Sequence, residues 1–354
     1  MMISWIHVRE IGVGWRSACR EPRRTCSERQ RRDRLRASAS ARRYVPPMRV
    51  LVTLPDPGPL ADLLKERRPE LEVRARNLND VTPDDFEWAE TLVGFRKPKV
   101  PGWGGIKWIH SIGAGVDGIL YGQDVPGTIL VTRSSEDFGP AIGEYCVARA
   151  LAVTQNLRRL DAQQQKHEWV DLDPVRLAGN RVLIVGTGMV GRGIARAFAA
   201  MRCVVDGLSR SGERVEGFRA VGRFDSFARE MAGVQWLVVA LPRTAATKHL
   251  VNRDRLAECG GAYLMNVGRG LTVEESAIPE AIDKGWISGA ALDVFEREPL
   301  PPDSPLWSHP KVTVTPHCSG PSTWDVTVDG FVECLLAIRG GRRPRWAVEH
   351  RRGY

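Results

Sequence analysis

The stretch Val182–Arg196 decides the fold of this chain, and it reads V-L-I-V-G-T-G-M-V-G-R-G-I-A-R. Its first four residues are apolar and largely branched, which indicates a strand buried on both faces. The next six residues fit the pattern G-x-G-x-x-G, which is typical of a phosphate-binding turn. Because this pattern follows a strand and opens a helix, it predicts a dinucleotide site rather than an ordinary glycine-rich turn.

Each glycine of the pattern has its own expected role. Gly186 makes the tight turn, Gly188 lets the backbone approach a pyrophosphate, and Gly191 lets helix and strand pack closely. The following helix directs its free N–H groups and the positive end of its dipole toward the phosphates. The predicted cofactor loop consists of Gly186, Thr187, Gly188, Met189, Val190 and Gly191.

The charge of the chain is unevenly distributed. The 354 residues carry a net charge of +9, but residues 1–47 hold 12 Arg, no Lys and 4 acids, so 9 − 8 = +1 remains for the rest. A nearly neutral body gives little electrostatic support for nucleic-acid binding, and no nucleic-acid partner is expected. No apolar run reaches the ~18 residues of a membrane span, so no membrane partner is expected either.

The cysteines and the N-terminal segment bear on where the protein works. Seven scattered cysteines without metal spacing indicate reduced thiols, a cytoplasmic location and no metal site. Residues 1–47 have no steady periodicity and are predicted to be a disordered, Arg-rich extension. Three explanations remain open: translation that begins at Met48, where a strand pattern starts at once, a transit segment, or a basic arm.

From Met48 onward, strand and helix patterns alternate, which predicts an α/β protein. We expect two Rossmann-like domains with doubly wound parallel sheets, the first of them flavodoxin-like. The substrate domain comprises residues 48–157 and 322–354, and the dinucleotide-binding domain comprises residues 158–321. One helix from Pro140 to about Leu160 is expected to link the two domains.

The individual elements follow from the same alternation. Strands are expected at 50–54, 71–75, 91–95, 106–111, 129–132, 182–185, 203–208, 234–240, 262–266, 289–293 and 312–315. Helices are expected at 60–67, from Pro83 with Thr82 as N-cap, after Gly191, and at 224–231, 253–257, 274–284 and 323–338.

Three short motifs each follow a predicted strand, where ligands bind in open α/β sheets. They are Asn266–Gly270 with Arg269, the acidic run Asp293–Pro299, and Thr315-Pro-His317. An arginine can fork two N–H donors onto a carboxylate. Each motif alone has an ordinary explanation, as a surface ion pair, a solvated loop or a structural histidine. Together they place a cation, an acid and a histidine on the rim that the glycine loop defines.

From Met48 to its end, the chain resembles the D-isomer-specific 2-hydroxyacid dehydrogenases in its ordered set of motifs. Within that family it most resembles the glyoxylate/hydroxypyruvate reductase branch. The branch is indicated by three short runs: Ser304-Pro305-Leu306-Trp307, Ser209-Arg210-Ser211 and the terminal Arg352-Gly353-Tyr354.

The resemblance implies the role of each site residue. His317 is the proton donor and acceptor, Glu298 is its acidic partner, and Arg269 holds the substrate carboxylate and orients the carbonyl. The backbone N–H groups of Gly113, Ala114 and Gly115 also hold the carboxylate. Asp293 lies near the nicotinamide amide, and Leu241, Pro242 and Thr247 flank the cofactor.

The implied reaction is reduction of a small 2-oxo acid, such as glyoxylate or hydroxypyruvate, to the D-2-hydroxy acid. The nicotinamide supplies the hydride, and Glu298 favours the protonated form of His317, which supplies the proton. A homodimer is expected from the resemblance. Two alternatives remain open: a phosphoglycerate dehydrogenase of the short type, and a non-catalytic NAD-sensing binding module.

The end of the second strand of the dinucleotide domain predicts that NADP(H) is preferred over NAD(H). In NAD-specific folds an acid about 20 residues beyond the first glycine binds the ribose 2′-OH. Ser209, Arg210 and Ser211 occupy this region, and none of them is acidic. Arg210 can pair with a 2′-phosphate, and both hydroxyls can donate to it. The alternative is an exposed turn with an incidental arginine.

Overall fold

The computed structural model describes residues 48–134, 137–351 and 353. The Arg-rich extension 1–47 lies outside the described residues, as do Arg352 and Tyr354 of the terminal motif. In the part of the chain that is described, no helix is long and apolar enough to cross a membrane.

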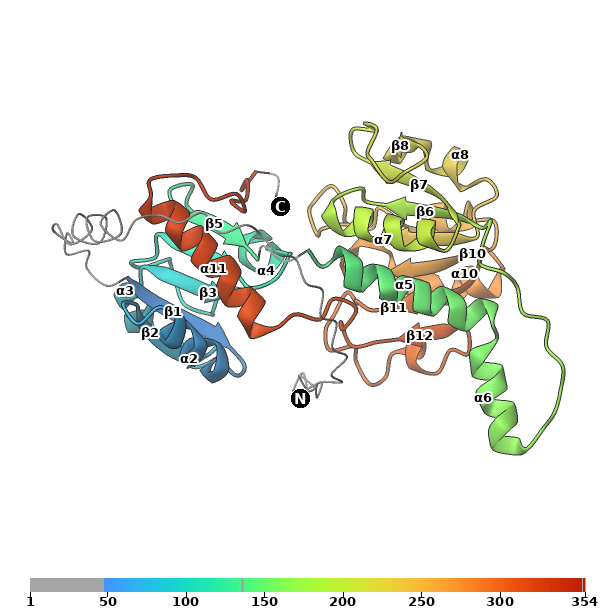
Figure 1. The fold of residues 1–354 in the computed structure, drawn as a ribbon, viewed down its shortest axis with the longest axis horizontal. Helices are drawn as coiled ribbons and strands as arrows, with labels where there is room; N and C mark the ends of the chain where they lie inside the picture. Colours follow the sequence, from blue (N-terminus) through green and yellow to red (C-terminus); the bar gives the residue numbers. More distant parts are fainter. Residues whose placement is uncertain (1–47, 135–136, 352, 354) are drawn as a thin grey trace, which may run out of the picture.

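The first sheet has five parallel strands in the order β2-β1-β3-β4-β5, which is the flavodoxin-like order. Helices α2 and α11 cover one face and α3 packs on the other, and Figure 1 shows α11 lying beside α2 although it comes last in the chain. The elements are β1 Arg49–Leu54, α2 Gly58–Arg67, β2 Glu72–Asn77, α3 Pro83–Trp88, β3 Thr91–Gly94, β4 Trp108–Ser111, α4 Asp117–Leu120, β5 Leu130–Arg133 and α11 Trp324–Arg339.

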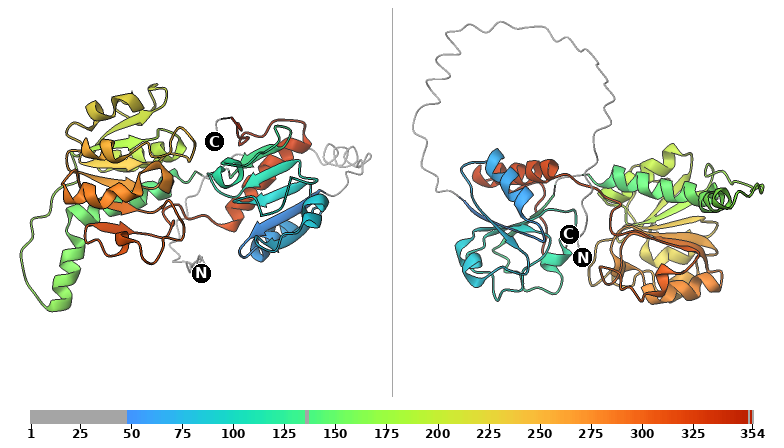
Figure 2. Two further views of the ribbon diagram at one scale, coloured as in Figure 1. Left: turned by 180° about the vertical axis from the view of Figure 1, so that it is seen from behind. Right: turned by 90° about the horizontal axis from the view of Figure 1, so that it is seen from below.

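The second sheet has seven parallel strands in the order β12-β11-β10-β9-β6-β7-β8, the dinucleotide-binding order with one strand added. Helices α5 and α7 cover one face, and α8, α9 and α10 cover the other (Figure 2). The strands are β6 Arg181–Val185, β7 Val204–Ser209, β8 Val221–Arg223, β9 Trp236–Val239, β10 Ala262–Asn266, β11 Ile287–Leu292 and β12 Val312–Val314. The helices are α5 Gly139–Thr154, α7 Met189–Ala200, α8 Phe227–Met231, α9 Arg253–Ala257 and α10 Ile278–Asp283, with 3-10 turns η1 Phe224–Ser226, η2 Gly270–Thr272, η3 Glu275–Ala277 and η4 Pro305–Trp307.

The predicted fold class is confirmed, and every predicted strand is present within two residues at either end. The prediction of one helix from Pro140 to about Leu160 is wrong. Asn156 adopts φ 54°, a left-handed conformation that ends α5 and starts a separate helix, α6 Leu157–Lys166, in a new direction. The apolar periodicity continued through this turn and so did not reveal it. The sequence analysis also omitted α4 and the edge strand β8.

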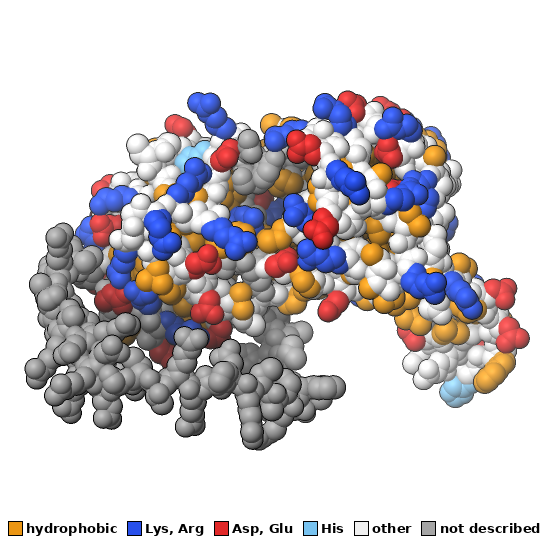
Figure 3. Space-filling view, turned by 45° about the horizontal axis from the view of Figure 1, so that its top comes forward, with side chains coloured by type: hydrophobic (Ala, Val, Ile, Leu, Met, Phe, Trp, Pro, Cys, Tyr) orange, Lys and Arg blue, Asp and Glu red, His pale blue; other side chains and the backbone are white. Residues whose placement is uncertain are grey.

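Helix α6 and residues 167–176 form an arm that projects from the second domain (Figure 1). No residue of the arm is buried, although it carries Leu157, Leu160, Trp169 and Val175. In Figure 3 the arm is a separate lobe with exposed hydrophobic and acidic side chains near its tip.

The chain connects the two domains just before α5 and again just before α11 (Figure 1). Helix α5 packs tightly on α7, because a Cβ on Gly193 would lie 2.2 Å from the carbonyl carbon of Gly139. This helix was expected to link the two domains, and its buried residues belong to the core of the second sheet. The domain boundaries at 157 and 321 stay predictions.

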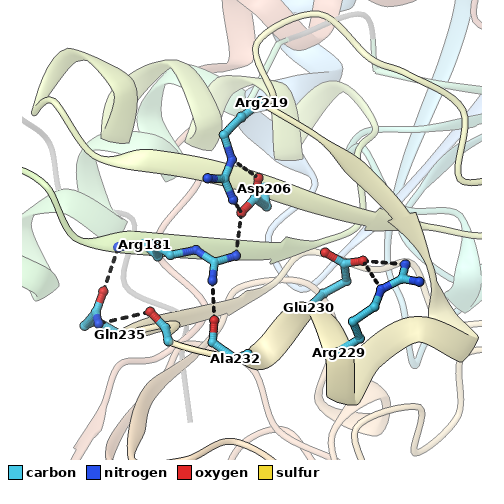
Figure 4. A network of polar contacts seen from close by, with 8 residues as sticks. Arg181, Asp206, Arg219, Arg229, Glu230, Ala232 and Gln235 are labelled. Carbon is cyan, nitrogen blue, oxygen red and sulfur yellow. Dashed lines mark hydrogen bonds and ion pairs between the residues drawn. The ribbon is translucent and has the colours of Figure 1, made fainter.

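Ion pairs around the buried Asp206 tie β7 to β6, the strand that leads to the glycine loop (Figure 4). Asp206 in β7 accepts hydrogen bonds from Arg181 Nη2 at 2.9 Å and from Arg219 Nε at 2.8 Å. Burial raises the pKa of Asp206, but the hydrogen bonds to Arg219 and Arg181 outweigh it and lower the pKa below its ordinary value. Arg181 begins β6, so one carboxylate ties the two strands together.

Candidate active site

The three glycines of the loop after β6 have the local geometry that the sequence predicted. Gly186 adopts φ 112°, and a Cβ there would lie 2.5 Å from the carbonyl oxygen of Ala240. A Cβ on Gly191 would lie 1.9 Å from the carbonyl oxygen of Gly186, so α7 approaches the turn very closely. A Cβ on Gly188 would meet nothing within 4 Å, so this glycine faces open space.

Helix α7 begins directly after Gly188, its N-cap residue, and no side chain caps it. The first N–H groups of a helix have no partner within the helix and attract an anion. The unpaired N–H groups at the start of α7, next to the open space above Gly188, suit the binding of a pyrophosphate. The residues present therefore fit a dinucleotide cofactor.

The end of β7 carries a free cation. Ser209 Oγ accepts from the Gly212 N–H at 3.0 Å and Ser211 Oγ from the Glu213 N–H at 3.3 Å, so both hydroxyls order the turn. Arg210 is exposed and forms no ion pair or hydrogen bond with any other described residue. The acid nearest to the strand end on β7, Asp206, is buried and paired, and so does not occupy the position that would bind a ribose 2′-OH.

The loop after β9 adjoins the glycine turn. A Cβ on Gly186 would lie 3.3 Å from Leu241 Cδ2. Thr247 donates to the carbonyl oxygen of Pro242 at 2.6 Å and accepts from the Thr244 N–H at 2.9 Å. The residues predicted to flank the cofactor thus form one ordered loop next to the predicted phosphate site.

The structure brings His317 and Glu298 together. His317 Nδ1 lies 2.9 Å from Glu298 Oε2, and the other oxygen, Oε1, accepts from the Phe295 N–H at 3.1 Å. Burial raises the pKa of Glu298. The hydrogen bond and the charge of His317 lower it by more than burial raises it, so the pKa of Glu298 lies below its ordinary value. The carboxylate orients the ring through Nδ1, which leaves Nε2 available for another partner.

Asp293 holds the loop that carries His317. It is fully buried, and it accepts from the Thr315 hydroxyl at 2.6 Å, the Cys318 N–H at 3.0 Å and the Ser319 N–H at 2.9 Å. Because Thr315 donates to Asp293, Tyr145 of α5 donates to Thr315, at 2.8 Å. The sequence motif included Thr315 without a role of its own, and Tyr145 was not predicted as a site residue. The expected position of Asp293 near the nicotinamide stays a prediction.

Arg269 is held by residues from both domains. Its Nε donates to Asp117 Oδ1 at 2.9 Å and its Nη1 to the carbonyl oxygen of Gly268 at 2.8 Å. Its carbonyl oxygen accepts from Asn266 Nδ2 at 3.2 Å, which fixes the turn. A Cβ on Gly270 would lie 1.8 Å from the carbonyl carbon of Phe295, so this turn packs against the loop that carries Glu298.

The loop Gly113–Gly115 meets Arg269 from the first domain. Its carbonyl oxygens are already bonded, that of Gly115 to the Ser111 hydroxyl at 2.7 Å and that of Gly113 to the Ser134 N–H at 3.2 Å. A Cβ on Gly115 would lie 1.7 Å from Arg269 Nη2, so only glycine allows this approach. The ring of Phe95, 44% exposed, lies against Gly113.

The predicted site residues thus form neighbouring groups: the glycine loop with Leu241–Thr247, Glu298 with His317, and Gly115 with Arg269. The charge of Arg269 also contributes to the lowered pKa of Glu298. Within the described ranges, no group of three or more His, Cys, Asp or Glu is placed to hold a metal ion.

Comparisons with known proteins find similar sequences and similar structures. Residues 147–319 match the family described as "D-isomer specific 2-hydroxyacid dehydrogenase, NAD binding domain". A protein named glyoxylate/hydroxypyruvate reductase A, from Serratia proteamaculans, is 32% identical over 301 residues, covering 82% of this chain and 94% of the relative.

Two solved structures are also similar over nearly their whole length. One is a D-isomer specific 2-hydroxyacid dehydrogenase from Xanthobacter autotrophicus Py2 in complex with NADPH and MES. It has a TM-score of 0.78 and 30% identity, and covers 88% of this chain and 100% of that chain. The other is an NADPH-dependent glyoxylate/hydroxypyruvate reductase from Sinorhizobium meliloti in complex with NADP and sulfate. It has a TM-score of 0.74 and 28% identity, and covers 87% of this chain and 100% of that chain.

Proposed function

Because this chain belongs to the D-isomer-specific 2-hydroxyacid dehydrogenase family of NAD(P)-dependent enzymes, we propose that it reduces glyoxylate, hydroxypyruvate or a similar small 2-oxo acid to the D-2-hydroxy acid. The observation that carries the proposal is the pair formed by His317 and Glu298, at 2.9 Å, on the strand ends beside Arg269. The name of the Serratia relative supports the choice of substrates.

His317 supplies the proton. Reduction of a carbonyl leaves negative charge on its oxygen, and a protonated imidazole at Nε2 neutralises that charge by donating. Glu298 accepts the hydrogen bond from Nδ1 and fixes the orientation of the ring. The nicotinamide cofactor supplies the hydride when bound.

Arg269 and the loop Gly113–Gly115 bind the substrate carboxylate. Nη2 of Arg269 forms no hydrogen bond with any described residue and lies against Gly115. The backbone N–H groups of Gly113, Ala114 and Gly115 add donors from the other domain. A carboxylate held from both sides places the adjacent carbonyl in one orientation toward His317.

The loop that binds the pyrophosphate consists of Gly186, Thr187, Gly188, Met189, Val190 and Gly191. Leu241, Pro242 and Thr247 flank the cofactor, and Asp293 lies near the nicotinamide amide. NADPH is preferred over NADH because the unpaired Arg210, with Ser209 and Ser211, meets the 2′-phosphate. The NADPH and NADP complexes of the two solved relatives support this preference.

The protein acts as a homodimer through its arm, residues 157–176. Leu160 is 43% exposed and Trp169 is 96% exposed, although both are large apolar residues. The helical part of the arm has a net positive charge, from Arg158, Arg159 and Lys166 against Asp161. The loop has a net negative charge, from Glu168, Asp171 and Asp173 against Arg176, so two arms are complementary in charge. Such a self-complementary patch suits a twofold interface. The cytoplasmic location stays a prediction.

A spectrophotometric assay tests the proposed reaction. Purified protein is mixed with NADPH and with glyoxylate or hydroxypyruvate, and the absorbance of NADPH is followed, with NADH in parallel. We expect turnover of at least one of these acids, and D-glycerate from hydroxypyruvate by chiral chromatography. Turnover of 3-phosphoglycerate with NAD⁺ alone would indicate the phosphoglycerate dehydrogenase alternative. No turnover of any 2-oxo acid would contradict the proposal.

A further inference from the structure

Two contacts join the short helix α4 of the first domain to loops of the second. Asp117, its first residue, accepts from Arg269 Nε at 2.9 Å, and the two side chains are only 19% and 28% exposed. Tyr121 follows directly after α4, and Arg243 Cζ lies 4.0 Å from the centre of its ring. Arg243 Nε is buried without a hydrogen-bond partner among the described residues, so its guanidinium is used for stacking.

The two contact residues, Asp117 in α4 and Tyr121 directly after it, are tied to each other. The Tyr121 N–H donates to the carbonyl oxygen of Asp117 at 2.9 Å, and Ile119 between them is buried in the first core. Their partners belong to different loops of the second domain. Arg269 lies in the turn that binds the substrate carboxylate, and Arg243 lies in the loop Leu241–Thr247 that flanks the cofactor.

We propose that Asp117 is a positioning residue for Arg269, and that α4 couples cofactor binding to the placement of Arg269 through its contacts with the second domain. This inference rests on the proposed function of Arg269.

The coupling follows from which domain supplies the acceptor of each hydrogen bond of Arg269. The Nη1 bond of Arg269 goes to Gly268 in its own turn and is unaffected by domain opening. The Nε bond crosses to the other domain, so it exists only while α4 lies against this turn. An arginine side chain that loses a fixed partner samples several rotamers. Asp117 therefore holds Nη2 beside Gly115 only while the two domains keep this contact.

The second contact extends this dependence to the cofactor. Thr247 holds Pro242 and Thr244 on either side of Arg243. A cofactor bound against this loop restrains Arg243 further, and Arg243 then holds Tyr121 and the rest of α4. Cofactor and substrate analogue consequently strengthen each other's binding.

The first experiment compares Asp117→Ala and Asp117→Asn with Asp124→Asn, an exposed acid just beyond α4 whose side chain has no partner among the described residues. We expect Asp117→Ala to lower kcat/KM for the 2-oxo acid by about 10- to 100-fold, because small misplacements of a positioning group have effects of this size. The dissociation constant for NADPH, from fluorescence titration, stays within about twofold, since Asp117 does not contact the cofactor loop. Asp117→Asn recovers part of the loss, because its amide oxygen still accepts from Nε.

The second experiment uses Tyr121→Leu, which removes the aromatic face and keeps the bulk. Calorimetry measures the binding of oxamate, an unreactive 2-oxo acid analogue, with and without NADPH. We expect NADPH to strengthen oxamate binding less in Tyr121→Leu than in the wild type or in Asp124→Asn. An unchanged coupling factor, or wild-type kcat/KM in Asp117→Ala, would overturn the inference.

These outcomes are separable from failure of the proposed function. If the wild type reduces a 2-oxo acid and Asp117→Ala does so equally well, only the inference is wrong. If the wild type reduces none, the proposed function is wrong, and small-angle X-ray scattering still tests the interdomain contact. Asp117→Ala should then be more open than Asp124→Asn, and identical scattering curves would contradict the contact as well.

Discussion

His317 has a backbone conformation that most side chains avoid, with φ 53°. Its N–H donates to the carbonyl oxygen of Asp293 at 2.9 Å, and the side chain of Asp293 holds the residues on either side. A left-handed conformation at a non-glycine residue costs of order 1–3 kcal/mol and persists only where the surroundings enforce it. Here the surroundings aim the imidazole at Glu298.

Replacing His317 removes the positioned proton donor. General acid catalysis is worth roughly 100- to 10,000-fold, so His317→Ala should lower kcat by an amount in this range. NADPH binding, measured by fluorescence titration, should change little. His350→Ala is a matched control, because His350 has no hydrogen-bond partner among the described residues. Wild-type kcat in His317→Ala would remove His317 from the mechanism.

The pH dependence of reduction follows from the same pair. The pKa of Glu298 lies below its ordinary value, so this carboxylate stays ionised at neutral and mildly acidic pH, and its stabilising effect is lost only as the pH falls through that lowered pKa. In Glu298→Gln the negative charge is absent at every pH, so kcat/KM should be lower than in the wild type and should no longer fall as the pH drops through the lowered pKa of this carboxyl group. An unchanged pH profile in this variant would contradict the role of Glu298.

Arg269 has donors that a lysine cannot reproduce. Its Nε and Nη1 bind Asp117 and Gly268, which leaves Nη2 for the substrate. Arg269→Lys keeps the charge but lacks the planar fork, so both KM for the 2-oxo acid and kcat should deteriorate, by about tenfold or more in kcat/KM. Steady-state kinetics measure both values. A Lys variant equal to the wild type would mean that Arg269 serves only as an ion-pair partner.

Arg210 should determine how strongly the protein binds the 2′-phosphate of NADPH. Hydrogen bonds to charged groups are worth roughly 1.5–3 kcal/mol, which corresponds to about 10- to 150-fold in affinity. Arg210→Ala should raise KM for NADPH by about that factor and leave KM for NADH nearly unchanged. Arg229→Ala, an exposed arginine that pairs with Glu230, is the control (Figure 4). If the effect is small, the double variant with Arg214→Ala tests whether the nearby arginine compensates.

At the scale of secondary-structure elements, the contact between α5 and α7 holds the start of α5, where the chain enters the second domain, against that domain. Gly139 and Gly193 lie so close that no Cβ fits on Gly193. Alanine ordinarily stabilises a helix relative to glycine. Gly193→Ala should instead destabilise the protein by about 1–3 kcal/mol, because the two helices must separate.

Urea unfolding measures the effect of Gly193→Ala. Gly58→Ala in α2 is the matched control, since a Cβ there would meet only Asp56 Oδ1, at 3.8 Å, in ordinary contact. The control should be as stable as the wild type or slightly more stable. A Gly193→Ala variant of equal or higher stability would mean that the helix contact adjusts without cost.

The elements also show what the sequence can and cannot predict. The alternation of strand and helix patterns along the chain located every strand in the two sheet cores, because buried parallel strands are continuous apolar runs. The edge strand β8 is half-buried and has no such run, and α4 is too short for a helical period. Asn156 ends α5 through its φ value, which no apolar pattern encodes.

In the candidate site, too, some residues were predictable from the sequence and others were not. Gly186, Gly188 and Gly191 were predictable, because their spacing expresses a local backbone geometry. The partners Asp117, Tyr145 and Thr315 lie far in sequence from Arg269 and Asp293, and they meet only through tertiary packing. Sequence spacing carries no information about such contacts.

At the scale of the whole molecule, the arm accounts for much of the exposed apolar surface. Leu160→Glu should disrupt the proposed dimer, because a charge in an apolar interface is desolvated without a partner. Sedimentation velocity should show a shift from dimer to monomer. Leu336→Glu on α11 is the control, since Leu336 is 51% exposed but lies outside the arm. An unchanged dimer in Leu160→Glu would mean that the arm is not the interface.

The return of α11 to the first sheet has a consequence for synthesis on the ribosome. Phe331 and Leu335 of α11 complete the core formed by Val50, Val52 and Trp108. At ~5–20 residues per second, the roughly 200 residues that separate β5 from these side chains take about 10–40 s to translate. During that interval the nascent first domain exposes the face that α11 will cover, while the second domain can already fold. The half of the enzyme that is made first is thus the last to be finished, and chaperones would have the most opportunity to bind it.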